Sequence, residues 1–298
     1  MPEYYLETWE EFEHRDAEIK REIRDCKADT AWAVSDVLYR GQADASWRLS
    51  TTLERQTDSM TLGEYLDIMQ NVQPYLQNIS VRKWPKLREK ITQLRQRGLQ
   101  YAHELPTVSA DTREILSFIV YLRQHGFPSP LLDWTRNPYI GAFFAFQNVR
   151  KETRRVAIYT FREQTQHSAD CRSVLDPNAF TIGPDIYEAS ERHKAQEAQY
   201  TICLKRLSCS TCLSDYVFGN HEEAVNLPGF RPTDGSDIAA AKNVTTKYTM
   251  PVSERRKFLQ KLHEKHINKC ELFGETPDNL LEDAWNAIVI SRRSRPEV

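Results

Sequence analysis

The sequence predicts a single domain of the α+β class, in which a small β core is flanked by helices. Short runs rich in β-branched and aromatic residues at 34–40, 155–161 and 199–204 have the length and composition of strands. Longer stretches with apolar residues at helical spacing separate these runs. The stretches with this spacing lie at 8–27, 61–80, 85–104, 112–124, from Pro138 onward, 253–268 and 277–290.

The first predicted helix is amphipathic and heavily charged. Trp9, Phe12, Ile19 and Ile23 form a thin apolar stripe, and the charged residues around them are spaced for i,i+4 ion pairs. The strand that follows ends in the tripeptide Tyr39-Arg40-Gly41.

The predicted helix that begins at Pro138 is apolar nearly all round, so we expect it at the centre of the domain. Asn137 suits the N-cap and Pro138 suits the first helical position. Before it, Gly126 is expected to end the helix 112–124. Loops and short strands are expected over 219–250.

The last two helices are predicted from their capping residues. Ser253 is expected to cap the first of them, and Thr276-Pro277 to open the second. The tail after 290 is expected to be flexible.

Bulk composition is that of an ordinary globular protein. The chain has 298 residues, of which 40% are hydrophobic and 28% charged, and its formal net charge is −2. This charge offers no global attraction for nucleic acid, so a polyanion would need a local patch. No segment approaches the apolar length of a membrane span, the N-terminus lacks the features of a signal peptide, and the six cysteines are sparse. These features predict a cytoplasmic protein that has no contact with membranes.

Three separated stretches suggest a site for an anionic ligand. Arg40 at a strand end, followed by Gly41 without a Cβ, would let a guanidinium and bare backbone approach an anion together. Thr135-Arg136 precedes the buried helix, whose N-terminus favours negative charge. Asp133 is an acceptor for Arg40 or a ribose hydroxyl. Tyr39 and Trp134 are candidate stacking surfaces for a flat ring.

A purely structural interpretation competes with this site. Asp133 then caps a turn, Trp134 fills the core, and Arg40 and Asp133 form a buried ion pair. Cys209 and Cys212 have CxxC spacing, but no second pair completes a zinc site, so no metal is expected. The basic residues around 83–97 are more typical of a solvated helix face than of a nucleic-acid contact.

The motifs resemble those of the FRG domain, a bacterial and phage family named for its Phe/Tyr-Arg-Gly signature. The resemblance runs over about residues 36–285, with 1–30 as an N-terminal helix, 31–290 as the domain and 291–298 as a flexible tail. The motifs that carry it are Tyr39-Arg40-Gly41-Gln42, Trp47-Arg48-Leu49, Gln124-His125-Gly126-Phe127-Pro128, Leu131-Leu132-Asp133-Trp134-Thr135, Asn137-Pro138, Arg192, Ala195-Gln196, Tyr200-Thr201, and the run from Phe258 to Leu280.

A remoter similarity links these motifs to ADP-ribosyltransferases of the Arg–Ser/Thr–Glu type. It implies a mixed or antiparallel split sheet, NAD as the substrate, and Arg40, Thr135 and the segment Gln196-Glu197-Ala198-Gln199 as the three functional elements. Glu197 would be the catalytic carboxylate, with Gln196 beside it. Gln199, not a glutamate, directly precedes the strand, which reverses the usual order of this motif.

The resemblance leads to three alternative functions. The first is an NAD-consuming ADP-ribosyltransferase that modifies RNA, DNA or protein as a bacterial toxin or antiphage effector, with an antitoxin as its partner. The second is a non-catalytic module that senses a nucleotide. The third is a nuclease or other nucleotide hydrolase, although no motif groups the acidic residues that a metal-dependent hydrolase needs.

Overall fold

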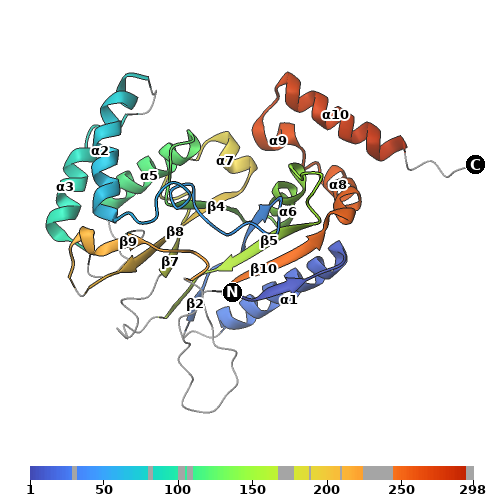
Figure 1. The fold of residues 1–298 in the computed structure, drawn as a ribbon, viewed down its shortest axis with the longest axis horizontal. Helices are drawn as coiled ribbons and strands as arrows, with labels where there is room; N and C mark the ends of the chain where they lie inside the picture. The colour runs from blue at the N-terminus through green and yellow to red at the C-terminus, as the bar shows by residue number, and fades with distance from the viewer. Residues whose placement is uncertain are drawn as a thin grey trace, which may run out of the picture.

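The computed structural model has helices and an open, mixed sheet of eight strands, which confirms the α+β prediction (Figure 1). The strands follow the order β1-β10-β5-β3-β4-β8-β7, and β9 pairs with β8. A separate pair joins β2 and β6. The residues that the structure describes are 1–28, 32–79, 83–99, 105, 110–166, 178–187, 189–208, 210–223 and 244–292.

The described elements have the following bounds. The strands are β1 (Glu3–Tyr5), β2 (Trp32–Val34), β3 (Leu38–Gln42), β4 (Leu131–Thr135), β5 (Arg155–Arg162), β6 (Gln164–Gln166), β7 (Asn178–Ile182), β8 (Ala198–Arg206), β9 (Tyr216–Phe218) and β10 (Val244–Pro251). The helices are α1 (Trp9–Ala28), α2 (Leu62–Ile79), α3 (Leu87–Arg97), α5 (Ala110–Gln124), α6 (Pro138–Gln147), α7 (Glu191–Ala195), α8 (Arg255–Glu264), α9 (Lys269–Phe273) and α10 (Pro277–Arg292).

The sheet is split between its two central strands. β3 pairs with β5 over five residues, and β4 pairs with β8 over five residues. Between β3 and β4 the pairing consists of one residue pair, Tyr39 with Thr135. The strands part beyond this pair, so the sheet has two halves that diverge from a common point.

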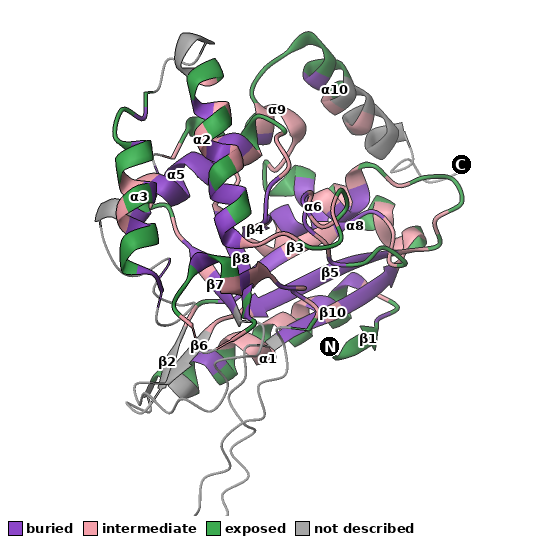
Figure 2. Cartoon of the chain, turned by 60° about the vertical axis from the view of Figure 1, so that its left-hand side comes forward, coloured by how far each residue is buried: buried purple, intermediate pink, exposed green. Residues whose placement is uncertain are grey.

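Each half of the sheet has its own helices and its own apolar core. α2, α3 and α5 pack with β4, β7 and β8, while α1, α6 and α8 pack with β3, β5 and β10 (Figures 1 and 2). A third cluster, which includes Leu38, Leu132 and Tyr159, lies on the opposite face of the central strands. Burial of apolar area in these clusters is the main source of stability of the fold.

Helix α6 lies directly on β3 because two glycines face each other. A Cβ on Gly41 would lie 2.0 Å from the carbonyl oxygen of Gly141 and 2.4 Å from the backbone nitrogen of Ala145. A Cβ on Gly141 would lie 2.8 Å from the Cβ of Tyr39. The glycine of the Tyr-Arg-Gly signature therefore makes room for a helix. The space left by its missing Cβ is filled by α6, while Gly41 also borders the cavity described below.

Most predicted helices are present. Asn137 caps α6 as predicted, since its Oδ1 accepts a hydrogen bond from the Tyr139 N–H, and Thr276 accepts one from the Asn279 N–H at the start of α10. The segment 131–135, for which the sequence predicts no strand, is the central strand β4. The predicted helix 253–268 is shorter in the structure: α8 runs from Arg255 to Glu264 with Glu254 instead of Ser253 at the N-cap position, and α9 is a separate helix that begins at Lys269. The flexible tail predicted at 291–298 lies mostly outside the described residues.

The N-terminal segment is part of the packed core. β1 pairs in parallel with β10, and Trp9 and Phe12 of α1 are almost fully buried against Tyr248 and Phe258. Ion pairs from Glu10 and Glu13 of α1 to lysines of α8 lie around this contact.

Candidate functional site

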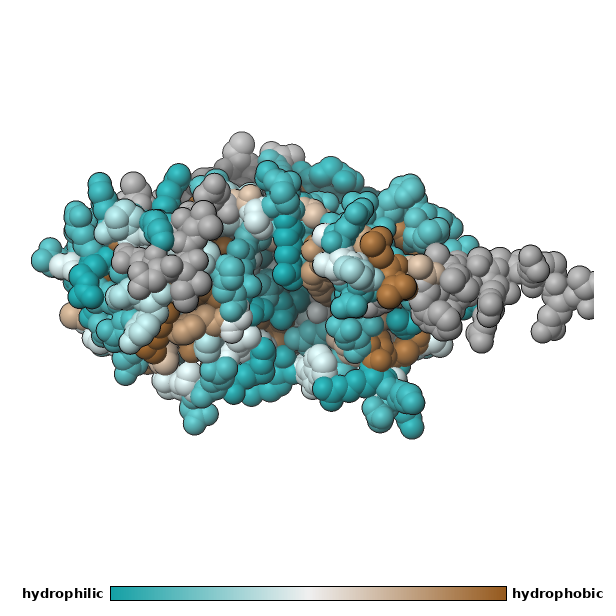
Figure 3. All heavy atoms as spheres, turned by 90° about the horizontal axis from the view of Figure 1, so that it is seen from above, coloured by the Kyte–Doolittle hydropathy of each residue, from teal (hydrophilic) through white to brown (hydrophobic). Residues whose placement is uncertain are grey.

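The candidate site is a cavity of about 1250 Å³ between the two halves of the split sheet. Its lining comes from β3, β4 and β8, from α5, α6 and α7, and from the loop after β3. Figure 3 shows a hollow with largely hydrophilic walls near the middle of the face seen from above. The cavity follows from the topology, because strands that part after one residue pair leave a space that side chains line.

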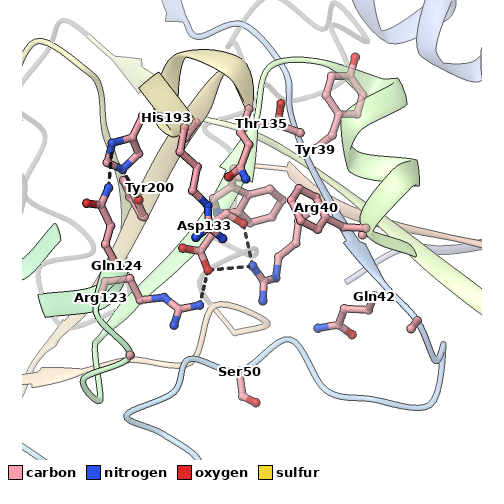
Figure 4. Close-up of a pocket in the computed structure, with 18 of the residues that line it drawn as sticks. Tyr39, Arg40, Gln42, Ser50, Arg123, Gln124, Asp133, Thr135, His193 and Tyr200 are labelled. Carbon is pink, nitrogen blue, oxygen red and sulfur yellow. Dashed lines mark hydrogen bonds and ion pairs between the residues drawn. The ribbon is translucent and has the colours of Figure 1, made fainter. Parts of the chain in front are cut away.

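Two arginines share one carboxylate at the centre of the cavity. Arg40 Nη1 donates to the main-chain oxygen of Asp133 at 2.8 Å and lies 3.5 Å from its Oδ2. Arg123 Nη2, from the last turn of α5, donates to the same Oδ2 (Figure 4). The Arg40 side chain is 18% exposed and that of Asp133 is 41% exposed. The Nε atoms of Arg40 and Arg123 are buried and have no hydrogen-bond partner in the described structure.

The charge of this cluster is not balanced. Burial lowers the pKa of the Arg40 guanidinium, Asp133 opposes this shift, and Arg123 adds to it. Independently of this shift, the contacts set two guanidiniums against one carboxylate. Within the described lining, Asp133 is the one acidic residue, whereas the arginines are Arg40, Arg48, Arg55, Arg123 and Arg192.

A hydrogen-bonded chain forms another wall of the cavity. His193 Nδ1 lies 2.8 Å from Gln124 Nε2, and His193 Nε2 lies 2.8 Å from the Tyr200 hydroxyl (Figure 4). Burial, with a contribution from Arg192, lowers the pKa of His193 to about 4, so the ring is neutral at pH 7. Burial is also the main cause that raises the pKa of Tyr200.

The structure brings together most of the residues that the sequence singled out. The predicted residues in the cavity lining are Tyr39, Arg40, Gly41, Asp133, Trp134, Thr135 and Gln196. Gln196 is also tied to α9, since its Nε2 donates to the Leu272 carbonyl oxygen at 3.0 Å. Arg136 and Glu197 are absent from the described lining.

The two aromatic rings that were expected to stack on a ligand are not available for that role. Tyr39 is 0% exposed, its ring packs in the core with α6, and its hydroxyl donates to Asp16 of α1. Trp134 is 3% exposed, and its indole N–H donates to the Thr201 hydroxyl at 2.8 Å on the opposite face of the sheet. Both residues border the cavity because they lie on the central strands, whereas their rings pack in the core.

Glu197 stands at the start of α6, where it has a structural partner. Its Oε1 accepts a hydrogen bond from Asn137 Nδ2 at 3.0 Å, and its main-chain oxygen accepts one from the Arg136 N–H. Its backbone φ of 45° is unusual for a non-glycine residue. A carboxylate at this position interacts favourably with the positive end of the helix. The helix N-terminus that was expected to bind phosphate is thus capped by Asn137 and neutralised by Glu197.

Arg123, His193 and Tyr200 were not assigned to the site from the sequence. Arg123 occupies the last turn of an amphipathic helix, where a basic residue needs no ligand to explain it. His193 and Tyr200 lie in a stretch that was noted for its motif, but the strand register that places Tyr200 beside Asp133 is visible only in the fold.

Other candidate sites receive no support from the described residues. In that part of the chain no three His, Cys, Asp or Glu side chains are grouped to hold a metal ion. Cys209 lies outside it, and Cys203 is buried. The basic helix α3 contributes no residue to the cavity lining, and Arg95 of this helix forms an ion pair with Asp67. No described helix combines the length and the apolar composition that a membrane crossing needs.

The fold and the site together define a split-sheet α+β domain with an arginine-rich cavity at the split. Residues 35–154 match the model of the FRG domain family, so the chain contains an FRG domain. The matched stretch includes β3, α5, β4 and α6, and with them Arg40, Arg123 and Asp133. No curated protein and no solved structure matches the chain.

Proposed function

We propose that the cavity binds NAD and that the protein transfers ADP-ribose from NAD to a macromolecule. The observation that carries the proposal is the pair of partly buried guanidiniums of Arg40 and Arg123, which share the single carboxylate of Asp133. A diphosphate would balance their excess positive charge by charge-assisted hydrogen bonds, to which the free Nε atoms also contribute. The cavity volume of about 1250 Å³ is ample for a dinucleotide.

In this proposal Asp133 replaces Glu197 as the catalytic carboxylate. Breaking the bond between nicotinamide and ribose sends the bonding electrons to the nicotinamide nitrogen and leaves positive charge on the ribose. A fixed carboxylate next to that charge stabilises the transition state. Asp133 is the acidic residue in the described lining, and its Oδ1 has no described hydrogen-bond partner. The acceptor group then bonds to the ribose carbon and loses a proton.

Labelled NAD tests this activity. Purified protein is incubated with NAD that carries label in the adenylate part, together with a cell extract, and samples are then treated with nuclease or protease. We expect label in macromolecules with the wild type and a loss of about 100-fold or more with Asp133→Asn, as for removal of one preorganised electrostatic group. Glu197→Gln serves as the matched carboxylate control outside the cavity. Sensitivity of the labelled product to nuclease or to protease identifies the acceptor as nucleic acid or protein.

A specific observation favours a second function, namely nucleotide binding without turnover. Asp133 Oδ2 is already engaged by Arg123 and lies near Arg40, which reduces the charge that the carboxylate offers to a reacting ribose. Binding of NAD without release of nicotinamide, in the presence of the extract, would establish this function instead.

The role as a bacterial toxin or antiphage effector is part of the proposal and depends on catalysis. Expression of the wild type in a bacterial host is then expected to arrest growth, and expression of Asp133→Asn is not. Equal growth of the two strains at equal protein levels would contradict the toxin role.

A further inference from the structure

The wall formed by Gln124, His193 and Tyr200 fixes the position of one proton. The backbone N–H of Ser190 points at His193 Nδ1, with a nitrogen–nitrogen distance of 3.1 Å. Because a backbone N–H can only donate, Nδ1 must carry a lone pair. Gln124 donates to the same atom. The neutral ring therefore has its hydrogen on Nε2.

This tautomer determines what the Tyr200 hydroxyl does. Nε2–H of His193 donates to the Tyr200 oxygen at 2.8 Å, so the hydroxyl acts as an acceptor on that side. Its own hydrogen is then free to be donated elsewhere, and it has no acceptor among the described residues. Tyr200 is 4% exposed and lines the cavity. A buried hydroxyl without an acceptor is unfavourable, so an acceptor supplied by a ligand is expected.

The charges around Tyr200 indicate which acceptor fits. Burial is the main cause that raises the pKa of Tyr200, Asp133 and Tyr187 add to the rise, and Arg123 and Arg192 oppose it. The guanidinium of Arg192 lies 4.8 Å from the centroid of the Phe273 ring, which fixes it at the rim of the cavity beside α9. Asp133 is already paired with Arg123, so the Arg192 guanidinium, in the same cavity lining as the hydroxyl donor, favours an anionic oxygen as the acceptor.

We propose that the Tyr200 hydroxyl and the Arg192 guanidinium form a phosphate-binding subsite, separate from Arg40, with His193 as the positioning residue. The subsite rests on the proposed function, because a dinucleotide supplies the phosphate. Its two donors come from β8 and α7, on the half of the sheet opposite Arg40. The ligand is thus held from both halves of the domain.

Titration calorimetry with pyrophosphate and with ADP-ribose tests the subsite. Tyr200→Phe removes the donor and keeps the ring, so we expect binding of both probes to weaken about tenfold, as for the loss of one hydrogen bond to a charged group. Arg192→Gln is expected to weaken binding by a similar factor. Tyr65→Phe is the matched control, since the Tyr65 hydroxyl is also buried but donates to the Pro128 carbonyl oxygen away from the cavity.

The role of His193 has its own readout. In nitrogen NMR spectra His193 is expected to have its proton on Nε2 at pH 7, and a proton on Nδ1 would overturn the subsite. His193→Phe is expected to weaken binding no more than Tyr200→Phe does, and the double variant no further than Tyr200→Phe, because His193 acts only by positioning the Tyr200 hydroxyl. Additive losses would overturn the positioning role.

The outcomes separate the subsite from the proposed function. If the wild type and Tyr200→Phe bind pyrophosphate and ADP-ribose equally well, the subsite is wrong and the proposed function stands. If the wild type binds neither probe, both proposals fail. Thermal melting of each variant, compared with Tyr65→Phe, detects any loss of fold.

Discussion

The cluster of Arg40, Asp133 and Arg123 predicts an asymmetry in stability. Asp133→Asn would leave two partly buried guanidiniums without a counter-charge. Breaking a buried ion pair typically costs about 3–5 kcal/mol. Because the Asp133 side chain is 41% exposed, solvent screens part of this loss, and we expect the free energy of unfolding to fall by about 2 kcal/mol.

The opposite substitution, Arg40→Met, is expected to cost less. Met keeps the apolar stem, Asp133 keeps Arg123 as its partner, and the repulsion between the two guanidiniums disappears. The lost hydrogen bond to the Asp133 carbonyl oxygen is worth about 1 kcal/mol, so the net change should lie within about 1 kcal/mol.

Urea denaturation at pH 7, followed by tryptophan fluorescence and by circular dichroism, measures both changes. Pyrophosphate should stabilise the wild type more than Arg40→Met, because the variant has lost one of the phosphate donors. If Arg40→Met destabilises the protein more than Asp133→Asn does, Arg40 is a structural ion-pair residue and the reasoning about excess charge is wrong.

Three further predictions follow from the geometry. Gly41→Ala should lower the free energy of unfolding by about 3 kcal/mol in urea denaturation, since its Cβ would lie 2.0 Å from the Gly141 carbonyl oxygen; an unchanged midpoint would contradict the packing role. Glu197→Gln should keep NAD turnover within about threefold of the wild type, since Glu197 does not line the described cavity. A loss of turnover as large as that of Asp133→Asn would show that Glu197 is the catalytic residue. Stability should fall as the pH drops from about 6.5 to 4, because the unfolded state binds a proton that the folded state, with the pKa of His193 near 4, excludes. His193→Gln should flatten this dependence by up to about 1.4 kcal/mol per pH unit, and an unchanged slope would show that His193 contributes nothing to it.

Patterns local in the sequence predicted the helices and the fold class. Asn137 and Pro138 predicted the start of α6, because capping depends on residues that are neighbours in the sequence. The apolar residues on all sides of α6 predicted its central position. Strand β4 was missed because Leu131–Thr135 is short and contains a charged residue, and only its pairing with β8 makes it a strand.

Only part of the candidate site was predicted, because the rest depends on how distant segments pack. Arg40 and Asp133 stood out as polar residues in apolar runs, but their common partner Arg123 depends on how α5 packs on β4. The predicted direction of three side chains differs from the structure. Strand alternation sets the direction of Tyr39 and Trp134, and the contact with the N-cap of α6 sets that of Glu197. A motif shows which residues matter, whereas the direction of each side chain depends on the register.

A crystal structure of the protein with ADP-ribose would test the central claim most directly. We predict that the diphosphate lies in the cavity at the split of the sheet, within hydrogen-bonding distance of the Arg40 or Arg123 guanidinium, with the terminal ribose next to Asp133. A diphosphate bound elsewhere, or a cavity without ligand at saturating ADP-ribose while the cluster of Arg40, Asp133 and Arg123 remains as it is, would contradict the account.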